Sequence, residues 1–311
     1  MSVPRRYPLI LNPKAKSERA RKAFQFVMEN ATRFAIYATN TADEARTLAC
    51  RFKDEGEPVV VAAGGDGTLN AVVRGLAGGE TTLGILPTGT MNVFAREMGI
   101  PFDQLKRALQ VIDEGNVEEV DLFEVNGTPF VQMAGVGFDA QVIEETSGES
   151  KKALGPLAYL LSAVKVLGDK PPKTTVTFEE GQTVEGVAVL LGNGTLYGGQ
   201  FRLFRKADNA DDLLDVVVFK EAGLKFVRDT LAGLARGGIK ADSGTVEYYQ
   251  SSGVKVSCER DVPVEVDGEF WGRGDELEFA HSERKLRVLA PEERGVAWWE
   301  EVLKTLAPWT K

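Results

Sequence analysis

The first part of the chain alternates between two hydrophobic patterns. Short apolar runs rich in β-branched residues predict strands, and each is followed by a segment whose apolar residues recur at helical spacing. Strands are predicted at 7–11, 33–38 and 82–86, and the stretch 59–70 predicts a further strand, a glycine turn and the start of a helix whose apolar spacing continues to Leu76. The other predicted helices are 39–55, 104–114 and one that opens with a turn at 12–17 and ends near 29. This alternation predicts a parallel sheet with helices on both faces, whose ligands bind beyond the carboxyl ends of the strands.

From about residue 120 the pattern changes to short apolar runs separated by Gly, Asn and Asp turns, which is typical of a mostly antiparallel β domain. The predicted strands are 130–133, 173–178, 187–191, 201–204, 216–219, 254–257, 262–266 and 286–289, and two helices interrupt them at 156–167 and 224–235. We therefore expect two domains. The α/β domain would comprise 1–121 with 290–311, and the β-rich domain would comprise 122–289.

The turn after the third predicted strand is rich in glycine. Gly64, Gly65 and Gly67 leave backbone N–H groups accessible at the start of the next helix, where a phosphate can bind. Asp66 would repel that phosphate unless a divalent cation bridges the two groups, so its presence suggests Mg²⁺ and phosphoryl transfer. An ordinary strand-to-helix turn with Asp66 as helix N-cap is the alternative, and this stretch alone leaves it open.

Composition narrows the choice of partner and compartment. The net charge is −9, which argues against nucleic acid as the main ligand because phosphate backbones require a basic surface. Cys50 and Cys258 lie far apart in apolar contexts, so we expect structural thiols in a reducing cytoplasm. The apolar run at the start is too short for a signal peptide, and no uncharged segment reaches the ~18 residues of a transmembrane helix. A lipid substrate would therefore be met by peripheral contact with the membrane.

The chain lacks the residues that several common types of active site require. The chain has no Gly-Lys pair, which excludes a P-loop, and its single histidine, His281, lies in a charged stretch that predicts a solvated surface turn. General acid–base catalysis would then have to be carried out by carboxylates, which form two clusters. The acidic run 208–215 suits Mg²⁺ or Ca²⁺, although a solvated turn is the alternative. The run 267–269 follows a predicted strand, and Asp-Gly is by itself typical of a hairpin turn.

Seven short motifs occur in a fixed order along the chain, namely Asn12-Pro13, 64–68, 86–92, 136–140, 197–199, 211–215 and 267–269. Taken in this order, they resemble the motifs of the bacterial diacylglycerol kinase and YegS-like lipid kinase family, relatives of sphingosine and ceramide kinases. The resemblance covers nearly the whole chain. The ordered set is more specific than Gly-Gly-Asp-Gly-Thr alone, which is similar to motifs of NAD kinases and phosphofructokinases.

The resemblance implies roles for individual residues. It implies an ATP site made of Asn12, Pro13, Lys14, Ala15, Lys16, Thr39, Gly64, Gly65, Asp66, Gly67, Thr68, Leu69, Asn70 and Thr90. It also implies a structural Mg²⁺ held by the side chain of Asp211 and the backbone carbonyls of Asp208 and Leu213. Glu269, with Asp267 beside it, would accept the proton of the substrate hydroxyl, and Asp66 would complete the catalytic acids. The reaction implied is transfer of the γ-phosphate of ATP to a lipid at a membrane surface.

Three positions depart from the family pattern. Val93 stands where many relatives have Asp, Gln200 replaces a third glycine, and Asp212 replaces the glycine of an Asp-Gly-Leu. Two alternatives to a lipid kinase stay open. One is an NAD kinase-like enzyme, and the other is a nucleotide-gated lipid-binding module whose kinase activity was lost with the acid missing at Val93. A homodimer also remains an open possibility.

The end of the chain is rich in tryptophan. Residues 295–309 carry Trp298, Trp299 and Trp309, and helical spacing gathers an apolar face there. We expect this segment to pack on the α/β domain as core. Docking on a membrane interface is the alternative, since tryptophan favours that environment.

Overall fold

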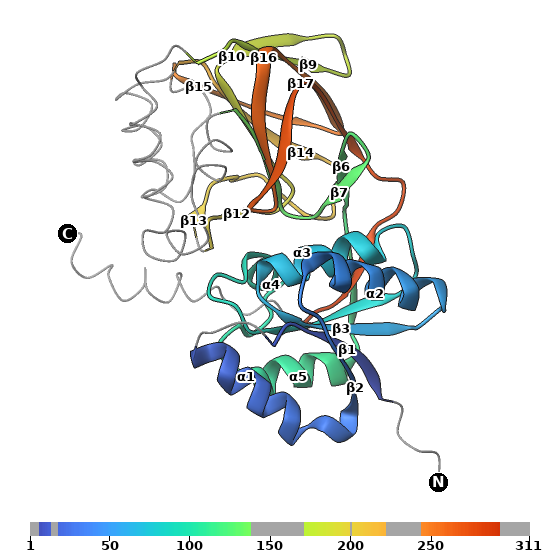
Figure 1. Cartoon of the computed structure of the whole chain (residues 1–311). Helices are drawn as coiled ribbons and strands as arrows, with labels where there is room; N and C mark the ends of the chain where they lie inside the picture. Colours follow the sequence, from blue (N-terminus) through green and yellow to red (C-terminus); the bar gives the residue numbers. More distant parts are fainter. Residues whose placement is uncertain (1–5, 14–17, 138–170, 200, 222–243, 293–311) are drawn as a thin grey trace, which may run out of the picture.

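A computed structural model describes residues 6–13, 18–137, 171–199, 201–221 and 244–292. The described chain forms two parts, each built around its own sheet (Figure 1). Several predictions fall outside these residues, namely those for Lys14, Ala15, Lys16, Gln200, the helices 156–167 and 224–235, and the segment 295–309. None of the described helices is long and apolar enough to cross a membrane.

The first part contains a six-stranded sheet. Its strands, in spatial order, are β2 (Phe34–Ala38), β1 (Tyr7–Leu11), β3 (Val59–Gly64), β4 (Thr82–Pro87), β18 (Leu286–Leu289) and β5 (Val117–Val120). The first five run parallel, and β5 is an antiparallel edge strand. All six residues of β4 are buried, as expected for a parallel strand covered on both faces.

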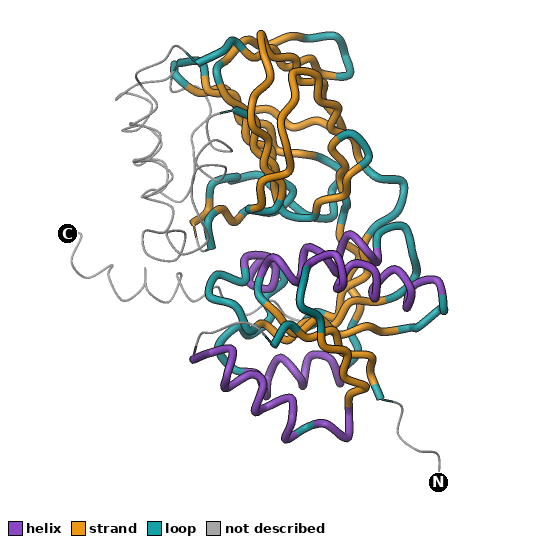
Figure 2. The backbone as a smooth tube through the Cα atoms, viewed as in Figure 1, coloured by secondary structure: helices purple, strands orange, loops and turns teal. Residues whose placement is uncertain are grey.

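Helices cover both faces of this sheet, with α2 and α3 on one side and α1 and α5 on the other (Figures 1 and 2). The helices are α1 (Glu18–Glu29), α2 (Ala42–Asp54), α3 (Asp66–Leu76), α4 (Val93–Glu97) and α5 (Leu105–Glu114), with a 3₁₀ turn at Ala31–Arg33. Thr41 caps α2 by accepting a hydrogen bond from the N–H of Glu44. The predicted α/β fold with helices on both faces is confirmed.

The second part is an antiparallel sheet of ten strands. Its strands are β6 (Phe123–Val125), β7 (Thr128–Phe130), β8 (Met133–Val136), β9 (Thr174–Phe178), β10 (Thr183–Gly186), β11 (Ala188–Gly192), β14 (Leu214–Phe219), β15 (Val246–Ser251), β16 (Gly253–Val266) and β17 (Glu269–His281). A separate pair joins β12 (Leu196–Tyr197) to β13 (Phe201–Arg202). Along β14, Val216 and Val218 join one apolar cluster while Val217 and Phe219 join another, so both faces of the sheet are covered.

The strand predictions need four corrections. The strand 286–289, predicted as part of the β domain, lies in the parallel sheet between β4 and β5. The separate strands 254–257 and 262–266 are one strand, β16, with a register shift between Ser257 and Val262. The predicted strand 130–133 is interrupted between β7 and β8, and only two residues of 201–204 are in a strand. Sheet membership and bulges depend on distant partners, which a local pattern does not contain.

Several elements were missed, among them the strands β6, β10, β12 and β15 of the second part. Strand β5 and the five-residue helix α4 are too short for a periodic signal. Strand β17 was missed because most of its residues are polar or exposed. This strand also corrects the interpretation of His281, which is not in a solvated turn. It ends β17 and packs edge-on against the ring of Phe123, with ring centres 5.1 Å apart.

The described chain crosses between the two sheets twice, and the crossings lie side by side. One joins β5 to β6 through Asp121 and Leu122, and the other joins β17 to β18. The N–H of Ser282 donates to the carbonyl of Leu122 at 2.8 Å, and Lys285 reaches Asp121 at 2.7 Å. The relative position of the two parts is therefore set at this paired crossing and at contacts of α3 and α4.

Candidate functional site

One face of α3 carries the hairpin turn between β16 and β17. Gly67, Asn70 and Arg74 are spaced three and four residues apart, so they lie on the same side of the helix. The side chain of Asn70 donates to the backbone carbonyl of Asp267 at 2.9 Å. Arg74 Nη1 lies 3.9 Å from Oε2 of Glu269. The glycine turn and the carboxylate cluster 267–269, far apart in sequence, therefore meet at one place.

Glu269 lies against the start of α3. A Cβ atom built on Gly67 would lie 2.8 Å from Oε1 of Glu269. The side chain of Glu269 is 40% exposed, so a ligand can reach it. A carboxylate is thus held beside a helix N-terminus whose N–H groups favour anions.

Asp267 has a different environment from Glu269, although only Gly268 separates them. Its carboxylate accepts the backbone N–H groups of Val131, Gln132 and Met133 at 3.2, 2.8 and 3.1 Å. Burial raises the pKa of Asp267, and these donors oppose the rise. Asp267 and Gly268 have φ angles of 51° and 79°, which a two-residue hairpin turn requires. The interpretation of Asp-Gly as a hairpin turn is confirmed, and the Asp267 carboxylate fastens that turn to the segment before β8.

Asp66 also accepts backbone N–H groups. Gly65 is the N-cap of α3, while the Asp66 carboxylate accepts the N–H of Asn92 at 2.9 Å and that of Val93 at 2.7 Å. These are the first N–H groups of α4, so Asp66 caps the neighbouring helix. Burial raises the pKa of Asp66, and the two N–H groups counter it. A catalytic role for Asp66 stays a prediction.

The two glycine turns are in direct contact. A Cβ atom built on Gly65 would lie 3.2 Å from the Cα of Gly89. The side chain of Asn92 accepts from the N–H of Gly89 at 3.0 Å and donates to its carbonyl at 2.8 Å. Asn92 itself has a φ of 49°, so the loop 88–92 is tightly folded. Thr90 is exposed on this loop, next to the glycine turn as the family resemblance implies.

The remaining predicted nucleotide residues are spread along the same edge of the sheet. Asn12 is half-buried and Pro13 exposed, directly after β1. Thr39 is buried after β2, and its N–H donates to the carbonyl of Leu11 at 2.8 Å. Thr68, Leu69 and Asn70 are buried in the first turns of α3. Thr68 packs beneath Gly64, where a Cβ atom would come within 2.4 Å of its Cβ.

Glu97 joins α4 to the β-rich part, and the motifs did not single it out. Its carboxylate accepts hydrogen bonds from Gln132 Nε2 at 3.0 Å, Thr195 Oγ1 at 2.9 Å and the N–H of Leu196 at 2.8 Å. Gln132 is buried, and its own N–H donates to Asp267. A continuous path therefore runs from Asp66 through α4, Glu97 and Gln132 to the turn that carries Glu269.

The acidic loop before β14 is tied together by its own groups. The N–H of Leu213 donates to the Asp211 carboxylate at 3.0 Å, and the N–H of Asp211 donates to the carbonyl of Asp208 at 3.3 Å. Burial raises the pKa of Asp211, and the negative charges of Asp208 and Asp121 add to the rise. Crowded carboxylate and carbonyl oxygens suit a hard divalent cation. The predicted Mg²⁺ ligands therefore fit that ion chemically.

A second group of possible metal ligands lies at the paired crossing. Ligand atoms of Asp121, Asp212 and His281 lie within 4.8 Å of one another. However, Lys285 Nζ lies 2.7 Å from a carboxylate oxygen of each aspartate. These contacts raise the pKa of Lys285 to about 12 and lower the pKa of Asp212. An ammonium thus compensates the charge that a metal ion would otherwise compensate.

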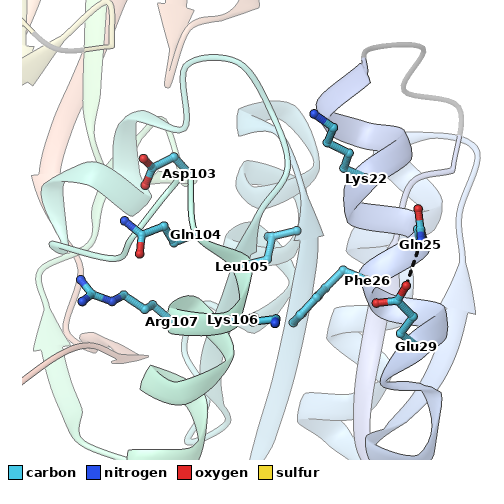
Figure 3. Close-up of a pocket in the computed structure, with 9 residues that line it drawn as sticks. All are labelled: Lys22, Gln25, Phe26, Glu29, Asp103, Gln104, Leu105, Lys106 and Arg107. Carbon is cyan, nitrogen blue, oxygen red and sulfur yellow. Dashed lines mark hydrogen bonds between the residues drawn. The ribbon is translucent and has the colours of Figure 1, made fainter.

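A hollow of about 460 Å³ opens between α1 and α5 (Figure 3). Lys22, Gln25, Phe26 and Glu29 line it from α1, and Asp103 to Arg107 line it from the other side. Gln25 donates to Glu29 at 2.8 Å across one helical turn. None of the predicted site residues is among this lining, so the hollow is separate from the site built on α3.

The two parts of the molecule match two different family models. Residues 6–125 match the diacylglycerol kinase catalytic domain, and residues 132–289 match the YegS C-terminal NAD kinase beta sandwich-like domain. A diacylglycerol kinase from Bacillus subtilis is 30% identical over 302 residues, covering 94% of this chain and 98% of that relative. A diacylglycerol kinase from Staphylococcus aureus is 32% identical over 261 residues, covering 83% and 82%. The resemblance inferred from the motifs is confirmed.

Solved structures show the same fold. A crystal structure of a diacylglycerol kinase from Bacillus anthracis superposes with a TM-score of 0.70 at 22% identity, covering 92% of this chain and 97% of that one. An NAD kinase from Archaeoglobus fulgidus in complex with ATP superposes with a TM-score of 0.53 at 14% identity, covering 96% and 98%. At these identities the likeness supports the fold and carries no information on the substrate.

Proposed function

Because this chain belongs to the family of bacterial diacylglycerol kinases and YegS-like lipid kinases, we propose that it transfers the γ-phosphate of ATP to a lipid hydroxyl group. The observation that carries the proposal is the contact between Glu269 and Gly67. It supports a proton acceptor beside the phosphate-binding turn. The lipid would be met at a membrane surface from the cytoplasm.

Glu269 is the acid best suited to accept the proton. The carboxylates of Asp66 and Asp267 each accept at least two backbone N–H groups, whereas the Glu269 side chain is 40% exposed beside the glycine turn. As the lipid oxygen attacks the γ-phosphorus, its proton passes to Glu269. The bond between that phosphorus and the oxygen bridging it to the β-phosphorus breaks, and ADP leaves with the bond electrons.

The glycine turn would hold the nucleotide phosphates. Gly64, Gly65 and Gly67 remove side chains that would block close approach, and the N-terminus of α3 supplies positive potential. Asp208, Asp211 and Leu213 would hold a structural Mg²⁺, which would compensate the negative charge of the acidic loop when bound.

The proposal is tested by transfer of label from γ-labelled ATP to a total lipid extract, with the product identified by mass. Glu269→Gln keeps the size of the side chain but removes the proton acceptor, so we expect the turnover number to fall by roughly 10²–10⁴-fold. Glu278→Gln is the matched control. It lies on the same strand, paired with Lys255 at 3.5 Å, and we expect it to retain activity.

Two outcomes would contradict the proposal. Labelling of NAD in place of any lipid would favour an NAD kinase-like enzyme. Intact ATP binding with no product from a broad lipid panel would favour a lipid-binding module that has lost the reaction, consistent with the missing acid at Val93.

A further inference from the structure

Two arginines from different helices converge on one aromatic ring beside the glycine turns. The guanidinium carbon of Arg96, on α4, lies 3.5 Å from the centre of the Phe102 ring. That of Arg19, in the first turn of α1, lies 5.5 Å from the same ring centre. Two positive charges are therefore held close together, although they lie far apart in the sequence.

Both arginines bind backbone carbonyl groups. Arg19 Nη1 donates to the carbonyl of Gly89 at 3.2 Å, and Arg96 Nε donates to that of Met91 at 2.5 Å. Among the described residues, no carboxylate lies within 4.0 Å of either guanidinium. Nη1 of Arg96 is buried and has no hydrogen-bond partner. Arg96 thus has an unused hydrogen-bond donor, and neither arginine forms an ion pair with a carboxylate of the described residues.

The arrangement is costly without an anion. Burial lowers the pKa of Arg96, and the charge of Arg19 lowers it further. Asp66 and Asp103 oppose this fall, but both act from beyond ion-pair distance, and the oxygens of Asp66 already accept N–H groups of Asn92 and Val93. An anion between two guanidinium groups would remove the repulsion, and the planar fork of arginine matches the oxygens of a phosphate.

The location connects this pair to the glycine turn. Arg19 donates to the carbonyl of Gly89, and Gly89 packs directly on Gly65. A Cβ atom built on Gly65 would lie 3.2 Å from the Cα of Gly89. We propose that Arg19 and Arg96 together bind a phosphate group of the nucleotide polyphosphate. This inference rests on the proposed function, and it assigns two residues that the family motifs did not include.

The test measures binding of inorganic tripolyphosphate and of ATP by calorimetry to wild type, Arg19→Gln and Arg96→Gln. A charge-assisted hydrogen bond contributes about 1.5–3 kcal/mol, so each variant should raise the Kd for tripolyphosphate about 10–100-fold. Adenosine, which has no phosphate, should bind all three proteins equally. Arg96→Lys keeps the charge but loses the fork, and we expect an intermediate Kd.

The chain offers a matched control in Arg51. It also lies over aromatic rings, 5.5 Å from the centre of Tyr37 and 4.8 Å from that of Phe52, but it pairs with Glu55 at 3.5 Å. Arg51→Gln should leave the Kd for tripolyphosphate unchanged.

Three results would overturn the inference. If Arg19→Gln and Arg96→Gln both bound tripolyphosphate with the Kd of wild type, the arginines would serve only to hold the loop 88–92 in place. Parallel loss of adenosine binding would point to a disordered loop. Weaker binding to phosphatidylglycerol vesicles with unchanged tripolyphosphate binding would assign the pair to lipid headgroups. Weakened tripolyphosphate binding in a protein that phosphorylates no lipid would support this inference and overturn the proposed reaction alone.

Discussion

The carboxylate of Glu269 occupies the space next to Gly67, across the two parts of the molecule: a Cβ atom at position 67 would lie 2.8 Å from its Oε1. Gly67 lies in the first turn of α3 and does not have a positive φ angle. Alanine would favour the helix by about 1 kcal/mol at such a position. The glycine is therefore explained by the space it leaves for Glu269 and a ligand.

Replacing Gly67 should separate stability from activity. In Gly67→Ala, the new methyl group would displace the flexible end of Glu269, which lies 2.8 Å from the Cβ position. We expect an unchanged or higher melting temperature and a fall in turnover number of about 10–100-fold, because small displacements of a reacting group are costly. Calorimetric melting and steady-state kinetics would measure the two effects. Wild-type turnover in this variant would contradict the placement of Glu269.

Asp267 should behave as a structural residue. Asp267→Ala leaves the N–H groups of Val131, Gln132 and Met133 without their acceptor, and we expect a loss of about 2–4 kcal/mol in unfolding free energy. Asp261→Ala is the control, since Asp261 is exposed on β16, the strand that leads into the turn at Asp267. Denaturant unfolding would measure both. If Asp267 were the base instead, Asp267→Asn would abolish turnover while its stability stayed close to that of wild type.

Local pattern was sufficient to predict the parallel sheet. The apolar run that starts at Val59 and the helical spacing of the residues after Gly67 depend on neighbouring residues, and the predicted strand and helix are present as β3 and α3. Strand β18 could not be assigned in this way. Its alternation fits either sheet, and its partners, β4 and β5, are more than 150 residues earlier in the chain.

The candidate site was predictable in its residue types but not in their roles. Gly67 and Glu269 belong to recognisable motifs, and the structure brings them together. Arg74 was missed, although its spacing from Gly67 places it on the same helix face and could have suggested it. Glu97 carries no such signal, because its partners come from a distant segment.

Glu97 should act as a positioning residue. Glu97→Ala removes the acceptor for Gln132, Thr195 and Leu196, so α4 would lose its connection to the turn that holds Glu269. We expect a loss of about 1–3 kcal/mol in unfolding free energy and a fall of about tenfold in turnover number. Glu114→Ala is the control, because Glu114 accepts a solvent-exposed hydrogen bond from Gln110 within the same helix.

A double-mutant cycle distinguishes positioning from general destabilisation. If Glu97 acts by placing Glu269, the additional loss of turnover caused by Glu97→Ala should nearly vanish in the Glu269→Gln background. Equal losses in both backgrounds would show that Glu97 acts on turnover independently of Glu269.

The last prediction concerns the paired crossing, where Lys285 holds two carboxylates together. Asp121 is fully buried, so Lys285→Met would leave its charge uncompensated, and we expect a loss of about 2–4 kcal/mol in unfolding free energy at neutral pH. The pKa of Lys285 is raised to about 12 from 10.5, so its stabilising contribution is complete below pH 10.5 and is lost as the pH rises through 12. Wild type should therefore lose more stability than Lys285→Met over that interval, as denaturant unfolding at several pH values would show. Lys255→Met removes a solvent-exposed pair with Glu278 and serves as the control. Equal pH profiles for wild type and Lys285→Met would show that the ammonium does not stabilise the crossing.

Removing the ammonium of Lys285 should also leave Asp121, Asp212 and His281 able to bind Mn²⁺. Added Mn²⁺ should then raise the melting temperature of Lys285→Met but not that of wild type.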